Sequence, residues 1–190
     1  MLNLTNQSVI LGIVGPIASG KGVMKKYVEE KYQAKDCRYS TMLRDVLQRL
    51  DIGNSRENLQ LLSTVLRQNF GEDLLARVIV KDAKHIEAGV VVIDGVRRMA
   101  DIKYLQEMNN FYLVAIEADQ RVRYERLVTR NENEGDKNKT FEQFLQDQQA
   151  EADQEVPLVM AKADFKIDNS KDLVNLYRQI DEMLNKLLIK

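Results

Sequence analysis

The sequence predicts an α/β domain built on a parallel sheet, and three observations carry this prediction. Almost continuously apolar runs at 9–14, 90–95 and 111–117 have the composition of strands covered on both faces. Segments with helical spacing of apolar residues separate these runs. A glycine-rich segment joins the first run to the first helical one. Because strands alternate with helices, we expect right-handed crossovers and ligands beyond the carboxyl ends of the strands.

Two weaker strand signals and a series of helices complete the expected chain order. The weaker strands are 34–38 and 165–168. The expected helices are 21–31, 40–50, 54–70, 72–87, 99–109 and 119–131, followed by one that begins at 140 and one that is capped by Ser170. The expected caps of three of them are Ser40 or Thr41, Asn54 in a capping box with Glu57, and Asp119. Two helical faces are expected to point inward, with Leu59, Leu62, Leu66 and Phe70 on one and Leu173, Leu176, Ile180, Met183 and Leu187 on the other.

Length and composition indicate one soluble domain over 1–190. The chain has 190 residues, 44% of them hydrophobic and 30% charged, which suffices for one core and is short for two. A net charge of −1 provides no overall basic field for nucleic acid or a membrane surface. Cys37 and His85 are single, which excludes an internal disulfide and a Cys/His zinc cluster; we expect Cys37 half-buried and His85 on the surface. The single cysteine fits a reducing, cytoplasmic location, and no apolar run approaches membrane-spanning length, so a soluble chain is expected.

The segment Gly15-Pro16-Ile17-Ala18-Ser19-Gly20-Lys21-Gly22 has the pattern of a phosphate-binding loop between a strand and a helix. Glycines let backbone N–H groups turn inward around an anion, and Lys21 can reach terminal phosphates. Gly22 and Val23 stand where a hydroxyl that binds Mg²⁺ is usual, so water, phosphates and a carboxylate elsewhere would hold the metal. The alternative is a glycine-rich turn with a surface lysine. The expected ATP-binding residues of this segment are Gly15, Ile17, Ala18, Ser19, Gly20, Lys21, Gly22 and Val23.

Asp94 closes an apolar strand at the expected ligand-binding edge of the sheet. A carboxylate there can hold Mg²⁺ or its waters beside the phosphates. The alternative is an aspartate that only ends a strand. Arg97 and Arg98 follow closely, and a guanidinium matches phosphate oxygens bidentately, so one or both could hold an acceptor's phosphate. A solvated arginine pair is the alternative, and we expect one of the two to be solvated.

Arg123, Arg126 and Arg130 recur on one face of a predicted helix, beside the polar stretch 131–139. This stretch is the segment most expected to be mobile. An arginine stripe next to a mobile loop is typical of a lid that closes over transferring phosphates and excludes water. A solvated face is the alternative, and it is the stronger reading for Arg121 and Arg123.

These motifs resemble the adenylate kinase-like branch of P-loop kinases. Residues 15–22 resemble that family's G-x-x-G-x-G-K-G loop. Ser40-Thr41-Met42-Leu43-Arg44 is similar to its acceptor-binding S-T-G-D-M-L-R, shortened by two residues. Asp94-Gly95-Val96-Arg97-Arg98 is similar to D-G-F-P-R, and Arg126 with Arg130 matches the spacing of the lid arginines.

The resemblance implies a P-loop NTPase three-layer sandwich with a five-stranded parallel sheet. It adds a helical acceptor-binding excursion at about 40–87 and a short lid at about 126–155. The nearest likeness is a mostly archaeal group described as nucleotide kinase-like or dephospho-coenzyme A kinase-like, which shares V-V-I-D-G-[IV]-R and a late A-D-x-x-I-x-N, here 163–169. By this resemblance Asn169 and Ser170 lie near the ATP base, and Thr41 and Arg44 bind the acceptor.

The sequence therefore predicts an ATP- and Mg²⁺-dependent kinase with a small nucleotide-like acceptor, most simply a nucleoside monophosphate. Lys21, Asp94, Arg126 and Arg130 would be catalytic, with Asp94 holding the metal. Two alternatives remain open. One is a dephospho-coenzyme A kinase in which Asp94 doubles as base. The other is a P-loop ATPase that acts as a switch or binding module without a small acceptor. The sequence leaves the acceptor, the base preference and the oligomeric state open.

Overall fold

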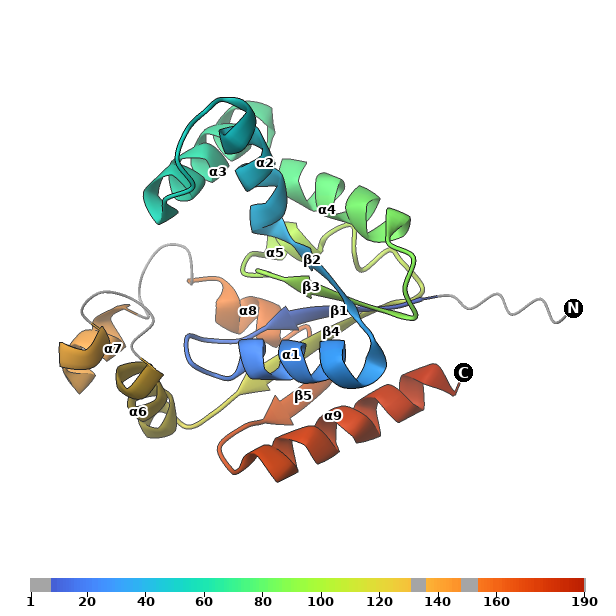
Figure 1. The fold of residues 1–190 in the computed structure, drawn as a ribbon, viewed down its shortest axis with the longest axis vertical. Coiled ribbons are helices and arrows are strands. Elements are labelled where there is room, and N and C mark those ends of the chain that lie inside the picture. The colour runs from blue at the N-terminus through green and yellow to red at the C-terminus, as the bar shows by residue number, and fades with distance from the viewer. Residues whose placement is uncertain (1–7, 131–135, 148–153, 190) are drawn as a thin grey trace, which may run out of the picture.

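Five parallel strands form the central sheet, in the order β2-β3-β1-β4-β5 (Figure 1). The computed structural model describes residues 8–130, 136–147 and 154–189. The strands are β1 (Val9–Val14), β2 (Lys35–Arg38), β3 (Val90–Asp94), β4 (Phe111–Glu117) and β5 (Phe165–Asp168). All four pairings between neighbouring strands are parallel. The five-stranded parallel sheet expected from the sequence is thus confirmed.

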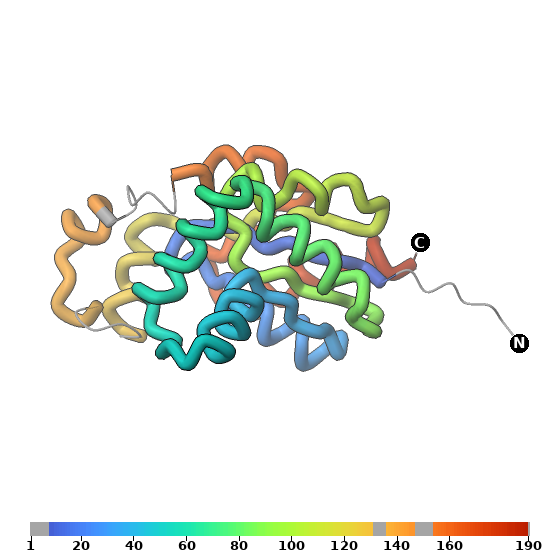
Figure 2. The backbone as a smooth tube through the Cα atoms, turned by 90° about the horizontal axis from the view of Figure 1, so that it is seen from above, coloured from blue at the N-terminus to red at the C-terminus, as the bar shows by residue number. Residues whose placement is uncertain are grey.

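Helices cover both faces of this sheet. They are α1 (Lys21–Tyr32), α2 (Tyr39–Arg49), α3 (Arg56–Phe70), α4 (Leu74–His85), α5 (Met99–Ile102), α6 (Gln120–Arg130), α7 (Phe141–Asp147), α8 (Val156–Met160) and α9 (Leu173–Leu188), with a 3₁₀ turn at Asp136–Asn138. One core packs α1 and α9 on the sheet, and the other packs α2, α4, α5 and α8 on the opposite face. Strands buried on both faces have no solvated side, which explains their continuous apolar runs. Figure 2 shows the layers along a second direction.

Several element boundaries differ from the sequence prediction. The helix expected over 99–109 is wrong: after the single turn α5, the chain continues in turns whose N–H groups bond three or four residues back. These turns bury both Ile102 and Leu105 against the sheet. Helix α8 was not anticipated, because five residues are too few for a periodic signal.

Helix ends account for the remaining differences. Ser55, rather than Asn54, caps α3 by accepting a hydrogen bond from the N–H of Asn58, and Asp172, rather than Ser170, caps α9. Phe70 and Leu173 were expected to face inward but are 64% and 52% exposed. Each is the terminal residue of its helix and so extends past the packed face. The other residues of both predicted apolar faces do pack in the two cores.

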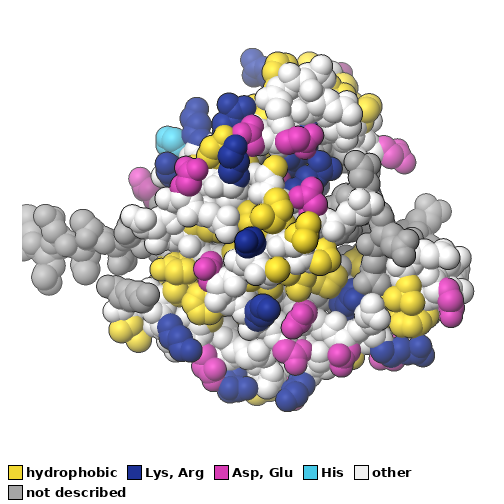
Figure 3. Space-filling view, turned by 180° about the vertical axis from the view of Figure 1, so that it is seen from behind, with side chains coloured by type: hydrophobic (Ala, Val, Ile, Leu, Met, Phe, Trp, Pro, Cys, Tyr) yellow, Lys and Arg dark blue, Asp and Glu magenta, His cyan; other side chains and the backbone are white. Residues whose placement is uncertain are grey.

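The surface agrees with a chain of balanced charge. On the face shown in Figure 3, Lys and Arg side chains are interspersed with Asp and Glu. His85 is exposed, as predicted, whereas Cys37 is fully buried rather than half-buried, at 6% exposure. Within the described residues no helix combines the length and the apolar character that crossing a bilayer would need.

Candidate phosphate-binding site

The predicted phosphate-binding loop lies between β1 and α1, beyond the carboxyl end of the central strand. Strands β3 and β4 flank β1 on its two sides, so the loop lies where the chain switches direction across the sheet, the usual place for ligands in such sheets. The loop needs its glycines. A Cβ on Gly15 would lie 2.2 Å from the carbonyl oxygen of Ile116, and Gly20 has φ +107°. The strand-loop-helix context predicted from the sequence is therefore present.

Two buried side chains hold the loop from outside the cavity. Asn169 follows β5 and donates from Nδ2 to the carbonyl oxygen of Ser19 at 2.8 Å. Arg123 on α6 donates from Nη1 to the carbonyl oxygen of Ile17 at 3.3 Å and from Nε to that of Ala118 at 3.1 Å. Arg123 is 4% exposed, and burial lowers the pKa of its guanidinium. The expectation that Arg123 is solvated was wrong: this arginine is a structural support of the loop.

Lys21 reaches over the loop rather than into solvent. Its Nζ donates to the carbonyl oxygens of Gly15 at 2.6 Å and Pro16 at 2.9 Å. The ammonium is therefore folded back over the loop, and its role in phosphate binding stays a prediction.

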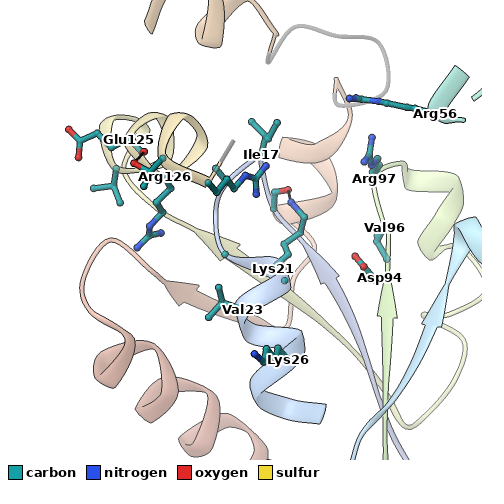
Figure 4. Close-up of a pocket in the computed structure, with 18 residues that line it drawn as sticks. Ile17, Lys21, Val23, Lys26, Arg56, Asp94, Val96, Arg97, Glu125 and Arg126 are labelled. Carbon is teal, nitrogen blue, oxygen red and sulfur yellow. Dashed lines mark hydrogen bonds between the residues drawn. The ribbon is translucent and has the colours of Figure 1, made fainter. Parts of the chain in front are cut away.

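A cavity of about 1110 Å³ opens above the loop (Figure 4). This volume exceeds the range of roughly 300–1,000 Å³ that is usual for a single small ligand, so it can accommodate a donor and an acceptor. Four segments supply the described residues that line it: Gly15, Ile17, Ala18, Gly20, Lys21, Gly22, Val23 and Lys26; Arg56; Asp94, Gly95, Val96 and Arg97; and Val122, Glu125, Arg126, Thr129 and Arg130.

The described part of the cavity lining is positive although the chain is nearly neutral. Its described lining includes six cationic side chains and two carboxylates, an excess of four positive charges. The whole chain has a formal net charge of −1. Concentrating one sign of charge in a hollow with apolar walls focuses the field on anions. The described lining therefore favours anionic ligands, phosphates among them.

Asp94 ends β3 and lines the cavity beside the loop. Lys25 on α1 lies close by, with Nζ 3.7 Å from Asp94 Oδ2 and 3.1 Å from Asp36 Oδ2. Arg38 Nε also contacts Asp36 Oδ2. Asp36 thus has two cationic partners, and Asp94 keeps a side chain that is 35% exposed toward the cavity. Sequence reasoning missed Lys25, since a lysine one turn after the loop carries no motif.

Asp94, next to the phosphate-binding loop, is suited to be the protein's carboxylate ligand for a Mg²⁺ ion that also binds a nucleotide's phosphates. Among the residues described, no three His, Cys, Asp or Glu side chains gather as a complete metal site. Mg²⁺ in kinase sites is usually held by one or two carboxylates, with phosphates and waters completing the shell. One accessible carboxylate beside the phosphate-binding loop matches that pattern.

The structure brings most of the predicted site residues together and leaves others apart. Arg97, Arg126 and Arg130 line the cavity with Lys21 and Asp94. Thr41 and Arg44 are exposed on α2 and do not line it. Arg98 is directed to Glu72, with Nη1 3.3 Å from Oε2, so it was Arg97 of the pair that reached the cavity. Ser19 and Asn169 lie behind the loop, in its support rather than in the lining. Arg56 was not anticipated, because it lies outside every motif.

The lid region is described only in part, because 131–135 and 148–153 lie outside the described residues. Its helix α7 packs with α6 in a small apolar cluster that includes Ala18, Leu127 and Phe144, with Ile17 at its edge. Helices α6 and α7 of the predicted lid therefore pack on the phosphate-binding loop. Arg126 Nη2 donates to the carbonyl oxygen of Lys171 at 3.5 Å.

Comparison with known proteins agrees with this fold. The family model described as "AAA domain" matches residues 11–154. A UPF0200 protein of Staphylothermus marinus is 30% identical over 134 residues, which cover 70% of this chain and 69% of that relative. The chain belongs to both families. A UPF0200 protein of Pyrococcus horikoshii is 28% identical over 185 residues, 95% of this chain and 98% of the relative.

Comparison with solved structures shows that this member of the two families has the P-loop kinase fold. A shikimate kinase from Bacteroides thetaiotaomicron superposes with a TM-score of 0.61 at 14% identity, over 96% of this chain and 99% of that one. The protein TT1252 from Thermus thermophilus gives 0.59 at 16% identity, over 95% and 98% of the two chains. At these identities the likeness establishes the fold, and the resemblance to the adenylate kinase-like branch stays a prediction.

Proposed function

We propose that the protein is an ATP-dependent phosphotransferase of the nucleoside monophosphate kinase type. One observation carries this proposal. The described lining of one cavity brings the phosphate-binding loop and Lys21 together with Asp94 and with arginines from two further segments. A shikimate kinase and a gluconokinase among the structures with the same fold are in keeping with phosphoryl transfer to a small molecule.

The reaction needs little covalent chemistry from the chain. An acceptor oxygen forms a bond to the γ-phosphorus of ATP, while the bond from that phosphorus to the β–γ bridging oxygen breaks and its electron pair stays on ADP. An acceptor that is itself an ionised phosphate has no proton to remove, so no general base is required. Catalysis then depends on positioning and on neutralising the charge of the transferring group.

The residues divide these tasks by their place in the cavity. The loop amides and Lys21 would hold the β- and γ-phosphates, and Asp94 would hold Mg²⁺. The bound ion would supply positive charge that neutralises the negative charge of the phosphates. Arg126 and Arg130 approach from α6 and would bind the migrating phosphoryl group. The packing of α7 on Ile17 and Ala18 couples the lid to the loop, so closure of the lid would exclude water from the same space.

The test compares Lys21→Ala with the wild-type chain on a panel of nucleoside monophosphates and dephospho-coenzyme A, with ATP and Mg²⁺ and detection of the phosphorylated product. We expect one nucleoside monophosphate to be phosphorylated by the wild type. The variant should lose on the order of 10²-fold or more in kcat/KM, by analogy with removal of one group that stabilises developing charge. Lys186→Ala, on the exposed last turn of α9, is the matched control.

The outcomes separate the alternatives. Product from dephospho-coenzyme A alone would replace the monophosphate acceptor with that one. Slow ATP hydrolysis whatever acceptor is offered would indicate an ATPase module instead. Full phosphotransfer by a folded Lys21→Ala variant would refute the assignment of the loop.

A further inference from the structure

We propose that Lys25 weakens the binding of divalent metal ions at Asp94 until a nucleotide is bound, because its ammonium group occupies the space between Asp36 and Asp94. The inference rests on the proposed function, since it concerns the carboxylate to which the metal is assigned there. Lys25 lies outside the described lining of the cavity. It is therefore a positioning residue, which acts through Asp94 rather than on the substrates.

Lys25 is a buried cation on α1. Its side chain is 11% exposed, whereas that of the neighbouring Lys26 is 74% exposed and pairs with Glu30 on the helix surface. Burying an ammonium group is costly unless carboxylates or other acceptors compensate its charge. The position of Lys25 therefore depends on its electrostatic partners.

Two neighbouring strands supply these partners. In the register of β2 and β3, Asp36 lies opposite Val92, two residues before Asp94 and on the same face of the sheet. The Nζ of Lys25 lies between the two carboxylates, 3.1 Å from Asp36 Oδ2 and 3.7 Å from Asp94 Oδ2. Within the part of the chain that the structure describes, Lys25 is the cation that pairs with Asp94.

The ammonium group stands where two carboxylates face one point, an arrangement that divalent ions favour. Asp36 also contacts the guanidinium group of Arg38, so the two carboxylates and their two cationic partners carry no net formal charge. Asp36 Oδ1 is buried and has no hydrogen-bond partner among the described residues. In the absence of a nucleotide, this neutral cluster leaves little attraction for a free divalent ion.

A bound nucleotide changes this balance, because its phosphates bring negative charge to the cavity that Asp94 lines (Figure 4). Asp94 can meet a metal ion on those phosphates, since its side chain is 35% exposed and only Oδ2 lies within 4.0 Å of Lys25 Nζ. Asp36, at the shorter distance, keeps Lys25 in place. The chain would thus take up its metal together with the nucleotide rather than before it.

The test measures Mn²⁺ binding to the nucleotide-free chain by electron paramagnetic resonance, with Mn²⁺ as a detectable substitute for Mg²⁺. Lys25→Met removes the charge and keeps an unbranched side chain. We expect its affinity for Mn²⁺ to exceed that of the wild type by about tenfold or more, because a positive charge close to the ion's site opposes binding. Adding Asp94→Asn to Lys25→Met should abolish the gain. Lys166→Met, exposed on β5 at the opposite edge of the sheet, is the matched control.

A second variant keeps the test decisive if Lys25→Met does not fold. Lys25→Gln is also neutral, and its amide can still donate a hydrogen bond to Asp36, so it should show the same gain. Circular dichroism establishes that each variant is folded. A lysine with only a structural role would lower the stability of these variants without raising their affinity for Mn²⁺.

Three results would overturn the inference. They are an unchanged Mn²⁺ affinity in the folded neutral variant, a gain that persists when Asp94→Asn is added, and an equal gain in Lys166→Met. Calorimetric titration of the wild type with ATP and Mg²⁺ tests the proposed function separately. Absence of ATP binding would refute that function, whereas ATP binding together with any of the three results refutes only the role of Lys25.

Discussion

The sides of the cavity to which we assign the donor and the acceptor are built in different ways. On the donor side, eight consecutive positions from Gly15 to Gly22 supply the loop, and β1 and α1 hold it from both ends. On the opposite side, the cavity-lining arginines Arg56 and Arg97 come from separate segments, and Asp101 bonds both the backbone N–H of Arg97 and the side chain of Arg67 on α3, the helix that Arg56 begins. The donor side is thus local in sequence, and the acceptor side depends on tertiary packing.

This contrast bears on how such a domain can vary. A contiguous phosphate-binding loop keeps its geometry as long as the strand before it and the helix after it keep their positions, because the shape of the loop follows from backbone conformation. An acceptor side assembled on an excursion can change its ligand when one helix shifts or one arginine is replaced. The difference fits a fold whose solved examples include a shikimate kinase and a gluconokinase.

The largest effect on stability is expected at the junction of the acceptor side. Asp101→Ala removes the partner of buried Arg67 and the acceptor of two backbone N–H groups, so we expect a loss of about 3–5 kcal/mol in the free energy of unfolding. Urea denaturation followed by circular dichroism measures it. Asp45→Ala, on the exposed side of α2, should change stability by less than about 0.5 kcal/mol.

A double-mutant cycle with Arg67→Ala shows whether this junction acts as one unit. Residues of one buried network are expected to be strongly non-additive, so the double variant should be little less stable than Asp101→Ala. Additive losses would mean that Arg67 and Asp101 stabilise the fold independently and would remove the support for a coupled acceptor side.

The second largest effect is expected for a substitution in the phosphate-binding loop. Gly15→Ala would place a Cβ 2.2 Å from the carbonyl oxygen of Ile116, which is backbone and has little freedom to move. We expect a loss of about 1–3 kcal/mol in stability, as for overpacking, together with loss of ATP binding measured by calorimetry. Gly53→Ala, in the excursion, meets nothing within 4 Å and should leave both quantities near wild type. Normal ATP affinity in Gly15→Ala would show that the loop tolerates the displacement.

The sequence predicted the sheet and the donor side because both leave local signals. Continuous apolar runs marked β1, β3 and β4, and the glycine spacing marked the loop. Asp94 was found by its place at the end of an apolar strand. Helix ends were less predictable, since Ser55 and Asn54, or Asp172 and Ser170, are equally good caps by residue type.

The residues that were missed or assigned the wrong role share a physical cause. Arg56, Lys25 and Arg123 are charged residues on helices, and their periodicity specifies a helix face without specifying what that face meets. Arg123 shares a predicted stripe with Arg126, but only Arg123 packs under the phosphate-binding loop at 4% exposure. Lys25 is distinguished from Lys26 only by the carboxylates of β2 and β3 that it meets in the folded chain.

The smallest expected effect is a pH dependence of stability that comes from Asp168. This residue precedes Asn169, which holds the phosphate-binding loop. Asp168 Oδ1 accepts hydrogen bonds from Ser170 Oγ at 2.6 Å and from Ser170 N–H at 2.9 Å. These bonds lower the pKa of Asp168 from its ordinary value of 3.8. A carboxyl group whose pKa is lower in the folded state stabilises the fold fully above its unfolded pKa, and the contribution disappears as the pH falls through the folded pKa.

Ser170→Ala removes the hydroxyl donor and should raise the pKa of Asp168 toward its ordinary value, which an NMR titration of the Asp168 carboxyl carbon measures directly. Because this carboxylate is exposed, the loss of stability at pH 6 should be slight, and the difference from the wild type should shrink further below pH 3.8 as both proteins become protonated. Ser63→Ala, on α3 in the acceptor excursion, is the control and should leave that titration unchanged. An unaltered Asp168 titration in Ser170→Ala would show that the hydroxyl does not stabilise the carboxylate, and Asn169 would then hold the loop without help from its neighbours.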